Sequence, residues 1–317
     1  MIYTVTLNPS LDYVMKLSQL KKGSLNRTQS EHITIGGKGI NVSAVLNELC
    51  IENIATGFSA GFTGIQLQSM LLDKGINQAF IVVRQGLTRI NVKLKETDTD
   101  TIGHEKIFET EVNGSGPVIT DFEICELKNS LERITKEDIM ILSGSIPKGV
   151  SDYIYRELAE FATERNAKTV IDASGSLLIN ALAAKPFLIK PNKDELVDIF
   201  GVKIDSLEAV IKYGTELRNM GAQNVLVSLG GAGAVLIANN GRVYMAKAPQ
   251  GQVISSVGAG DSMVAGFIAG YINNPDDYEN ALILGTAAGS ATAFSIETAL
   301  RESIMNLRSS VATETIF

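Results

Sequence analysis

The chain has 317 residues, of which 45% are hydrophobic and 20% charged, and its formal net charge is -7. These values are ordinary for a folded protein with a substantial core. The acidic balance and the lack of a Lys/Arg cluster argue against a nucleic-acid-binding protein. A small anionic ligand stays compatible with this charge, because a few cations inside a cleft are enough to hold it.

The sequence predicts neither a membrane span nor a leader. No run of about 18 apolar residues occurs, and the stretch Met1–Pro9 has neither a basic start nor a long apolar core. We therefore expect a cytoplasmic protein. Cys50 and Cys125 lack the spacing of metal ligands and lie in apolar-periodic stretches, which predicts two buried free thiols.

Strands and helices alternate in the first part of the chain. Residues 1–7 alternate and are rich in β-branched side chains, as is typical of a strand. A glycine turn at 36–39 precedes residues 40–49, whose apolar positions have helical spacing. The next predicted elements are a strand at 54–58, a helix at 62–75 and a strand at 79–83.

Two segments do not fit this rhythm. Residues 88–95 alternate strictly, like a strand with one face in water, and a weaker strand near 105–112 would complete a hairpin. Residues 10–35 are mixed and polar, with a strand predicted at 31–35. We expect the segments at about 10–35 and 88–112 to form a small β-sheet lid over one edge of the main sheet.

The second half of the chain returns to alternating strands and helices. A helix is expected at about 151–165. Compact apolar runs predict strands at 138–143, 169–172, 187–192 and 224–230. Such runs suit parallel strands that are buried on both faces, so the sequence predicts an α/β fold with a mostly parallel sheet. With no internal repeat or linker, residues 1–317 are expected to form a single domain.

Glycine and polar residues that follow predicted strands are the first candidates for a site, because ligands of parallel sheets bind at the carboxyl ends of the strands. Gly258-Ala259-Gly260 precedes Asp261 at the start of a predicted helix. Free N–H groups there attract anions, and Asp261 could accept a proton from an attacking hydroxyl. Alternatively, Asp261 would simply cap the helix.

Three other segments have two interpretations each. Gly36-Gly37-Lys38-Gly39-Ile40-Asn41 suits a polyhydroxylated or anionic ligand, or is a plain strand-to-helix turn. Asn192 and Glu195 could organise a hydrated Mg²⁺, or form a capping box. The turn from Ser228 to Gly233 could admit a nucleotide, or connect two strands of a hairpin. A Walker A loop is absent from the sequence.

In this order, the four segments resemble the PfkB carbohydrate kinase family. The matching signatures are Gly36–Val42 and the Gly258–Asp261 turn, the latter preceded by Asp172 and by Lys190-Pro191-Asn192-x-x-Glu195. The resemblance covers nearly the whole chain, from Thr6 to the helix after Asp261. It implies a ribokinase-like three-layer fold with a mostly parallel central sheet and a small β-sheet lid.

The resemblance also implies a role for each site residue. Asp261 would be the catalytic base, and Gly258, Ala259 and Gly260 would form an anion hole for the transferring phosphoryl group. The implied substrate-binding residues are Asp12, Gly37, Lys38, Asn41, Arg89, Asn91 and Ser143. The implied ATP-binding residues are Lys190, Asn192, Ser228, Gly230, Gly233, Ser256 and Val257. Asn192 and Glu195 would position Mg²⁺, mainly through water.

Two stretches resemble the subgroup that phosphorylates fructose 1-phosphate at the 6-hydroxyl to give fructose 1,6-bisphosphate. They are Thr88–Leu94, in which the guanidinium of Arg89 suits a substrate phosphate, and Ser143–Gly149. A tagatose-6-phosphate kinase is the near alternative, and a non-catalytic sugar-phosphate sensor is an alternative of another class. Bare edge strands are a liability, so we expect the lid to pair two copies into a homodimer.

Overall fold

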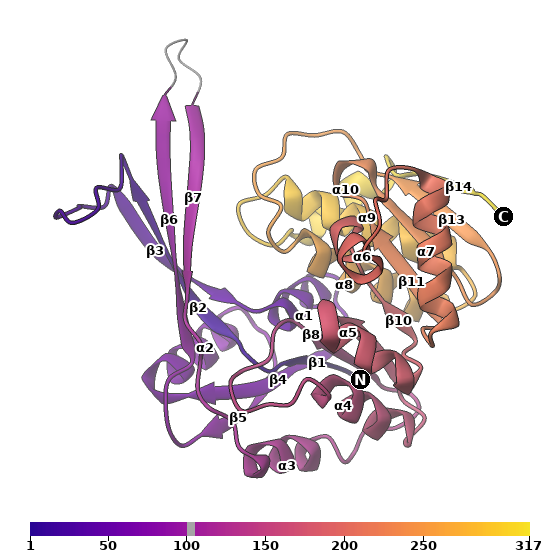
Figure 1. The fold of residues 1–317 in the computed structure, drawn as a ribbon, viewed down its shortest axis with the longest axis horizontal. Helices are drawn as coiled ribbons and strands as arrows, with labels where there is room; N and C mark the ends of the chain where they lie inside the picture. The colour runs from indigo at the N-terminus through magenta and orange to yellow at the C-terminus, as the bar shows by residue number, and fades with distance from the viewer. Residues whose placement is uncertain (100–104) are drawn as a thin grey trace.

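The computed structural model describes residues 1–99 and 105–317, and the side chains outside 97–107. A large sheet with helices on both faces forms the body, and a small sheet rises from one side of it (Figure 1). The strands are β1 (Ile2–Thr6), β2 (Ser10–Leu17), β3 (Ser30–Gly36), β4 (Asn53–Ala60), β5 (Gln78–Val83), β6 (Arg89–Thr99), β7 (Glu105–Asn113), β8 (Ile139–Ser143), β9 (Lys168–Asp172), β10 (Leu188–Ile189), β11 (Asn224–Ser228), β12 (Ala234–Ile237), β13 (Val243–Lys247) and β14 (Ala312–Thr315).

The large sheet has ten strands in the order β14-β13-β12-β11-β10-β9-β8-β1-β4-β5. Every pairing from β11 to β5 is parallel, and the three pairings from β14 to β11 are antiparallel. The predicted three-layer α/β fold with a mostly parallel sheet is therefore confirmed.

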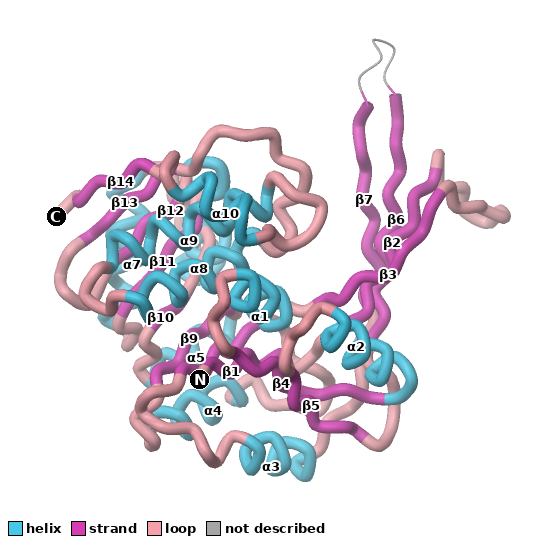
Figure 2. Tube along the Cα trace, turned by 180° about the vertical axis from the view of Figure 1, so that it is seen from behind, coloured by secondary structure: helices cyan, strands magenta, loops and turns pink. Residues whose placement is uncertain are grey.

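Helices cover both faces of the large sheet (Figures 1 and 2). They are α1 (Lys38–Glu48), α2 (Gly61–Asp73), α3 (Asp121–Ser130), α4 (Ile154–Thr163), α5 (Gly175–Ala181), α6 (Lys193–Phe200), α7 (Leu207–Asn219), α8 (Ala259–Asn273), α9 (Tyr278–Ala293) and α10 (Arg301–Arg308), with short 3₁₀ turns at Leu182–Ala184 and Gly230–Ala232. Met140 and Leu142 of β8 pack into one buried cluster with α4, α5 and α7, while Ile141 packs into a second with α1, α8 and α9. This alternation is the period of a strand buried on both faces.

The small sheet has the order β3-β2-β6-β7 and places its two faces in different surroundings. β2 pairs with β3 antiparallel and with β6 parallel, and β6 and β7 form the predicted hairpin. The register aligns one row of apolar side chains across the four strands, made of Ile33, Tyr13, Val92 and Val112. The next row, on the opposite face, is Thr34, Asp12, Asn91 and Asn113.

Three expectations about local structure were wrong. β10 covers only Leu188–Ile189 instead of 187–192, because Pro191 cannot donate a ladder hydrogen bond. Cys50 and Cys125 are exposed rather than buried. Cys50 follows the end of α1 in a left-handed conformation with a φ of 59°, and Cys125 lies on the solvent side of α3.

The segment at 10–35 contains two strands, β2 and β3, where one was predicted. Among the residues that the structure describes, no helix is both long and apolar enough to span a membrane.

Candidate active site

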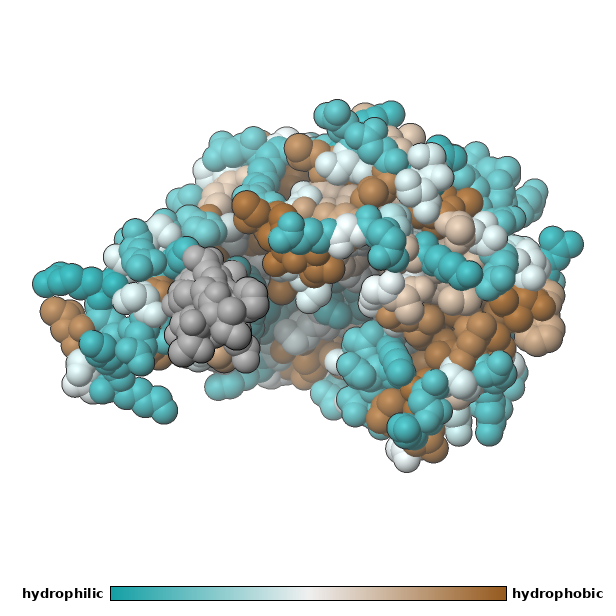
Figure 3. Space-filling model, turned by 90° about the horizontal axis from the view of Figure 1, so that it is seen from above, coloured by the Kyte–Doolittle hydropathy of each residue, from teal (hydrophilic) through white to brown (hydrophobic). Residues whose placement is uncertain are grey.

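The main cleft has a volume of about 1270 Å³ and lies between the small sheet and the loops that follow β10 and β11. The space-filling view shows the molecule hollowed in this region (Figure 3). With the single exception of Ser143, every residue that the sequence indicated for the site lines this cleft. The structure thus brings together segments that are more than 200 residues apart, such as Asn41 and Asp261, which share a hydrogen bond.

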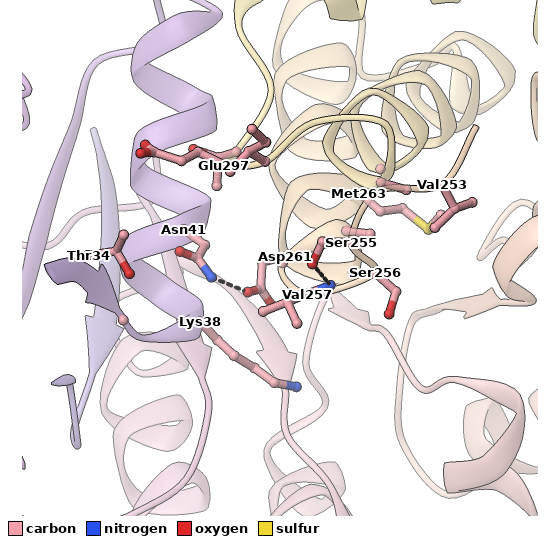
Figure 4. A pocket seen from close by; sticks show the side chains of 18 of the residues that line it. Thr34, Lys38, Asn41, Val253, Ser255, Ser256, Val257, Asp261, Met263 and Glu297 are labelled. Atoms are coloured by element: carbon pink, nitrogen blue, oxygen red, sulfur yellow. Dashed lines mark hydrogen bonds between the residues drawn. The ribbon is translucent and has the colours of Figure 1, made fainter. Parts of the chain in front are cut away.

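Asp261 lies in the first turn of α8, but it does not cap the helix. The N-cap is Gly258, whose φ of 78° is a left-handed conformation that suits glycine. The Asp261 side chain makes no capping hydrogen bond, and its Oδ2 instead accepts a hydrogen bond from Asn41 Nδ2 at 2.8 Å (Figure 4). The capping interpretation is therefore wrong for Asp261, and its carboxylate is directed into the cleft.

The surroundings of Asp261 make its carboxylate a better base than an exposed one. Burial and then the negative charge of Asp172 raise the pKa of Asp261 to about 7, against the opposing influence of Lys38. Residue 261 is only 6% exposed. A general base works best when its pKa lies near the operating pH, so Asp261 has the properties that proton abstraction from a hydroxyl requires.

A second buried carboxylate, Asp172, lies at the end of β9 beneath Asp261. Its Oδ1 forms ion pairs with Lys38 Nζ at 3.3 Å and Lys190 Nζ at 3.4 Å. Burial alone would raise the pKa of Asp172, but the two ammonium groups hold this pKa below its usual range. The sequence signature contained Asp172 without a role. The signal that would have found one is its position at the carboxyl end of a buried strand.

On the small sheet, Asp12 is held rigidly by its neighbours. Its Oδ1 accepts hydrogen bonds from Ser10 Oγ at 2.6 Å and from Asn91 Nδ2 at 2.9 Å. Its Oδ2 lies 3.1 Å from Lys93 Nζ. A carboxylate oriented in this way can receive sugar hydroxyls without first ordering its side chain.

Lys93 is a cleft residue that the sequence interpretation did not single out. Burial disfavours the charged form of Lys93. The nearby carboxylates, above all that of Asp12, more than offset this effect and hold the pKa of Lys93 above its ordinary value. The signal was available, since Lys93 is two residues after Asn91 on a strictly alternating strand and must share its face.

A second cavity of about 320 Å³ adjoins the cleft and shares Arg89, Lys38 and Gly37 with it. Arg89 is oriented there by a 3.0 Å hydrogen bond from its Nε to the carbonyl oxygen of Asn8. Ser143 lines neither cavity, because its side chain is fully buried at the end of β8. The following residues Gly144 and Ser145 line the second cavity in its place.

Asn192 and Glu195 form the capping box at the start of α6. Asn192 Oδ1 accepts a hydrogen bond from the Glu195 backbone N–H at 2.7 Å, and Glu195 Oε2 accepts one from the Asn192 backbone N–H at 2.8 Å. Both side chains also line the cleft. The two interpretations of this pair are therefore compatible, because the capping box uses only one carboxylate oxygen of Glu195, Oε2.

The loop after β11 is both a hairpin turn and a wall of the cleft. β11 and β12 pair antiparallel across it, which confirms the hairpin. At Gly233, with a φ of 104°, a Cβ atom would come within 1.9 Å of the Ala246 carbonyl oxygen, so only glycine fits. Ser228, Gly230 and Gly233 line the cleft together with Ser256 and Val257 of the facing loop.

Metal-binding clusters are not a feature of the described part of the chain: no group of three or more His, Cys, Asp or Glu residues there could hold an ion.

Comparison with known proteins agrees with this geometry. Residues 5–303 match the family described as pfkB family carbohydrate kinase. The chain is 43% identical to a 1-phosphofructokinase of Bacillus subtilis over 97% of both chains. It is 36% identical to a D-tagatose-1-phosphate kinase of Bacillus licheniformis over 93% of both.

A solved structure of phosphofructokinase-2 from Escherichia coli in complex with fructose-6-phosphate is 28% identical, covers 98% of each chain and gives a TM-score of 0.86. A family match over nearly the whole length, together with relatives of this similarity, shows what the fold and the cleft had indicated. The chain belongs to the pfkB family of carbohydrate kinases.

Proposed function

We propose that the protein transfers the γ-phosphoryl group of ATP to the 6-hydroxyl of fructose 1-phosphate, giving fructose 1,6-bisphosphate. The observation that carries this proposal is Asp261, a buried carboxylate at a helix N-terminus whose pKa is raised to about 7. A pure binding protein needs no such base, so this feature favours an enzyme over a non-catalytic sensor. The 1-phosphofructokinase name of the Bacillus subtilis relative supports the choice of substrate.

Asp261 acts first in the proposed reaction. Its carboxylate takes the proton of the substrate hydroxyl as the oxygen attacks the phosphoryl group. The N–H groups of Gly258, Ala259 and Gly260 lie at the N-terminus of the 15-residue helix α8, where the helix dipole favours negative charge. They stabilise the charge that develops on the transferring group.

The small sheet and the start of α1 bind the sugar. Asp12 and Asn91, already hydrogen-bonded to each other, accept and donate to ring hydroxyls, with Gly37, Lys38 and Asn41 opposite them. The phosphate of the substrate is held by Arg89, whose guanidinium suits a phosphate in geometry and charge. The second cavity beside Arg89 provides space for that phosphate.

The nucleotide occupies the other end of the cleft. Its phosphates lie toward Lys190, while Ser228, Gly230, Gly233, Ser256 and Val257 line the remainder. Val253 and Ile296 are 62% and 83% exposed and line the cleft, so they offer an apolar surface to the base. Glu195 and Asn192 would hold the Mg²⁺ that accompanies ATP, mainly through water, and this ion would neutralise phosphate charge.

The small sheet acts as a lid and as the contact between two copies in a homodimer. Its apolar row, Ile33, Tyr13, Val92 and Val112, lies on the face opposite Asp12. Ile33 and Val112 are 48% and 60% exposed in the single chain. A matching row from a second copy would remove this apolar surface from water.

A substrate panel tests the proposal. Initial rates with ATP are measured for fructose 1-phosphate, tagatose 1-phosphate, tagatose 6-phosphate, fructose 6-phosphate and ribose, and are compared as kcat/KM. We expect the highest value for fructose 1-phosphate. A higher kcat/KM for either tagatose phosphate would make that sugar phosphate the substrate and would still agree with a kinase. Calorimetric binding of the sugar phosphates without turnover of any of them would favour the sensor.

A further inference from the structure

We infer that Asp172 is a positioning residue: its buried carboxylate holds the ammonium groups of Lys38 and Lys190 in place around Asp261. This inference rests on the proposed phosphoryl transfer, and it assigns a role to a residue that touches neither sugar nor nucleotide. Asp172 is fully buried and lines neither cavity, whereas both lysines line the cleft. It therefore acts through other residues.

One oxygen of Asp172 serves both lysines. Oδ1 lies 3.3 Å from Lys38 Nζ and 3.4 Å from Lys190 Nζ. Lys38 begins α1, and Lys190 follows β10 with its backbone N–H donating to the Ile171 carbonyl oxygen. Two elements from distant parts of the chain are thus joined through a single atom at the floor of the cleft.

The two ammonium groups point to different parts of the site. A Cβ atom added at Gly260 would lie 3.0 Å from Lys190 Nζ, so this ammonium group lies against the glycine turn that receives the phosphoryl group. Lys38 lines both the cleft and the second cavity, which places its charge on the sugar side. Asp172 therefore fixes one cation on each side of the transfer.

The charges of this cluster are explained better by binding of an anion than by a contribution to the stability of the fold. Lys38, Lys190, Asp172 and ionised Asp261 are neutral together, and one positive charge is in excess once Asp261 has taken the proton of the substrate. Buried ion pairs contribute little to stability, because removing the charges from water offsets their attraction. An excess positive charge is useful where phosphate groups must be received.

The second oxygen of Asp172 is a further sign of a functional constraint. Oδ2 is buried and has no hydrogen-bond partner in the described part of the chain, and the same is true of Ser143 Oγ. Ser143 and Asp172 are paired in the register of β8 and β9. Unsatisfied buried polar groups are unfavourable for folding, so a role other than stability explains their retention better.

The positions of these charges determine the basicity of Asp261. The charged groups with the largest influence on the pKa of Asp261 are Asp172, then Lys38 and Lys190. Asp172 raises the pKa of Asp261 through its own charge, and it holds in place the two lysines that lower this pKa. In Asp172→Asn these effects oppose each other, because loss of the carboxylate charge lowers the pKa of Asp261 and release of the lysines raises it. The charge of Asp172 ranks above that of either lysine among the causes, so we expect Asp261 to become a weaker base.

The test compares Asp172→Asn with the wild-type enzyme and with Asp138→Asn. Asp138 is also buried and ion-paired, with the amino group of Met1 at 2.7 Å, but it lies at the opposite end of the same sheet. We expect Asp172→Asn to lower kcat by about 10²-fold, as displaced catalytic groups do. We also expect it to move the acid limb of the kcat profile down by about one pH unit.

The control variant is expected to keep the wild-type profile. A folded Asp172→Asn enzyme with an unshifted acid limb and a wild-type kcat would overturn the positioning role. A wild-type enzyme inactive on every sugar of the panel would overturn the proposed function as well, so the two failures are distinguishable.

A second measurement covers the case in which Asp172→Asn does not fold. Lys38→Met, Lys190→Met and the double variant form a double-mutant cycle in kcat/KM. If Asp172 links the two lysines, their effects on kcat/KM are not independent. The double variant should then retain at least about tenfold more activity than the two single losses, multiplied together, would leave. Independent, multiplying effects would overturn the inference.

Discussion

The floor of the cleft and its small-sheet wall differ in how their charges are exposed. On and beneath the floor, Asp172, Lys190 and Asp261 are 0%, 5% and 6% exposed, and the side chain of Lys38, at 40%, is the exception. Along the wall, exposure of the side chains increases outward on β6, from 13% at Lys93 to 39% at Lys95. Charges act on one another more strongly where water is excluded, so the floor can shift a pKa strongly while the wall chiefly attracts and orients a ligand.

This difference suggests a division of labour. The floor determines that a phosphoryl group is transferred, and the wall determines which sugar receives it. Changes on the floor should therefore alter kcat and its pH dependence, whereas changes on the wall should alter KM for the sugar phosphate.

The largest effect is expected from Asp261→Asn. Loss of the base should lower kcat by about 10²–10⁴-fold, while calorimetry should show ATP and sugar phosphate still binding. The matched control is Asp277→Asn, since Asp277 is a helix-start aspartate that does cap, accepting from the Asn280 N–H at 2.9 Å. The control should retain wild-type turnover. Near wild-type turnover in the Asp261 variant would refute the assignment of the base.

The pH dependence of the wild-type enzyme should show the raised pKa of Asp261. Because the ionised carboxylate is the active form, kcat should rise with pH through about 7. Folding should respond in the opposite sense. The unfolded chain releases this proton near the ordinary pKa of 3.8 and the folded chain near about 7, so the contribution of Asp261 to stability is lost as pH rises through that window.

Two measurements check this prediction. Rate profiles should place the acid limb near neutrality, and a limb near the ordinary aspartate value would contradict it. Urea unfolding at about pH 5 and about pH 8 should show that Asp261→Asn gains more stability relative to wild type at the higher pH, because wild type loses stability between the two.

Substitutions in the small-sheet wall should change the KM for the sugar phosphate. Arg89→Met and Lys93→Met each remove a cation from the sugar side and should raise KM for fructose 1-phosphate by about 10–100-fold, the value of a charged hydrogen bond, with kcat changed little. Lys95→Met, one step further out on the same face, is the matched control and should change KM by less than about threefold. A loss of kcat at unchanged KM would mean that these residues act in phosphoryl transfer, as the residues of the floor do.

The smallest effect on a single active site is expected from the apolar row of the small sheet. Val92→Glu would place a charge in the proposed contact between copies and should shift the protein from dimer to monomer in sedimentation velocity at micromolar concentration. Lys95→Met, on the opposite face, should leave the dimer intact. A wild-type protein that is monomeric at this concentration would contradict the proposed contact.

Local patterns predicted the fold, and they marked segments that the structure brings together at one cleft. Apolar runs closed by polar residues marked the parallel strands, and glycine turns marked the loops at their carboxyl ends. Asp261 and Asn41 come from such segments and meet across 2.8 Å. Sequence order alone could not tell whether Asp261 capped its helix, because that depends on a partner 220 residues away.

The errors arose where a role depends on three-dimensional packing. Ser143 lies in a stretch that resembles the family, but its side chain is buried beside Asp172 and not in the cleft. Cys50 was expected in the core because its neighbours are apolar, yet the chain reverses at that residue with a φ of 59°. Lys93 was not predicted, although it follows Asn91 by two residues on an alternating strand and so shares its face.

The alternation of the small sheet also limits how this protein can change by insertion or deletion. One residue gained or lost within β2 would exchange its two faces, directing Asp12 outward and Tyr13 into the cleft. A single slip would thus remove the sugar site and the apolar face together. Length variation should therefore be confined to the turns of this sheet, and homologous chains that differ within Ser10–Leu17 should differ by substitution alone.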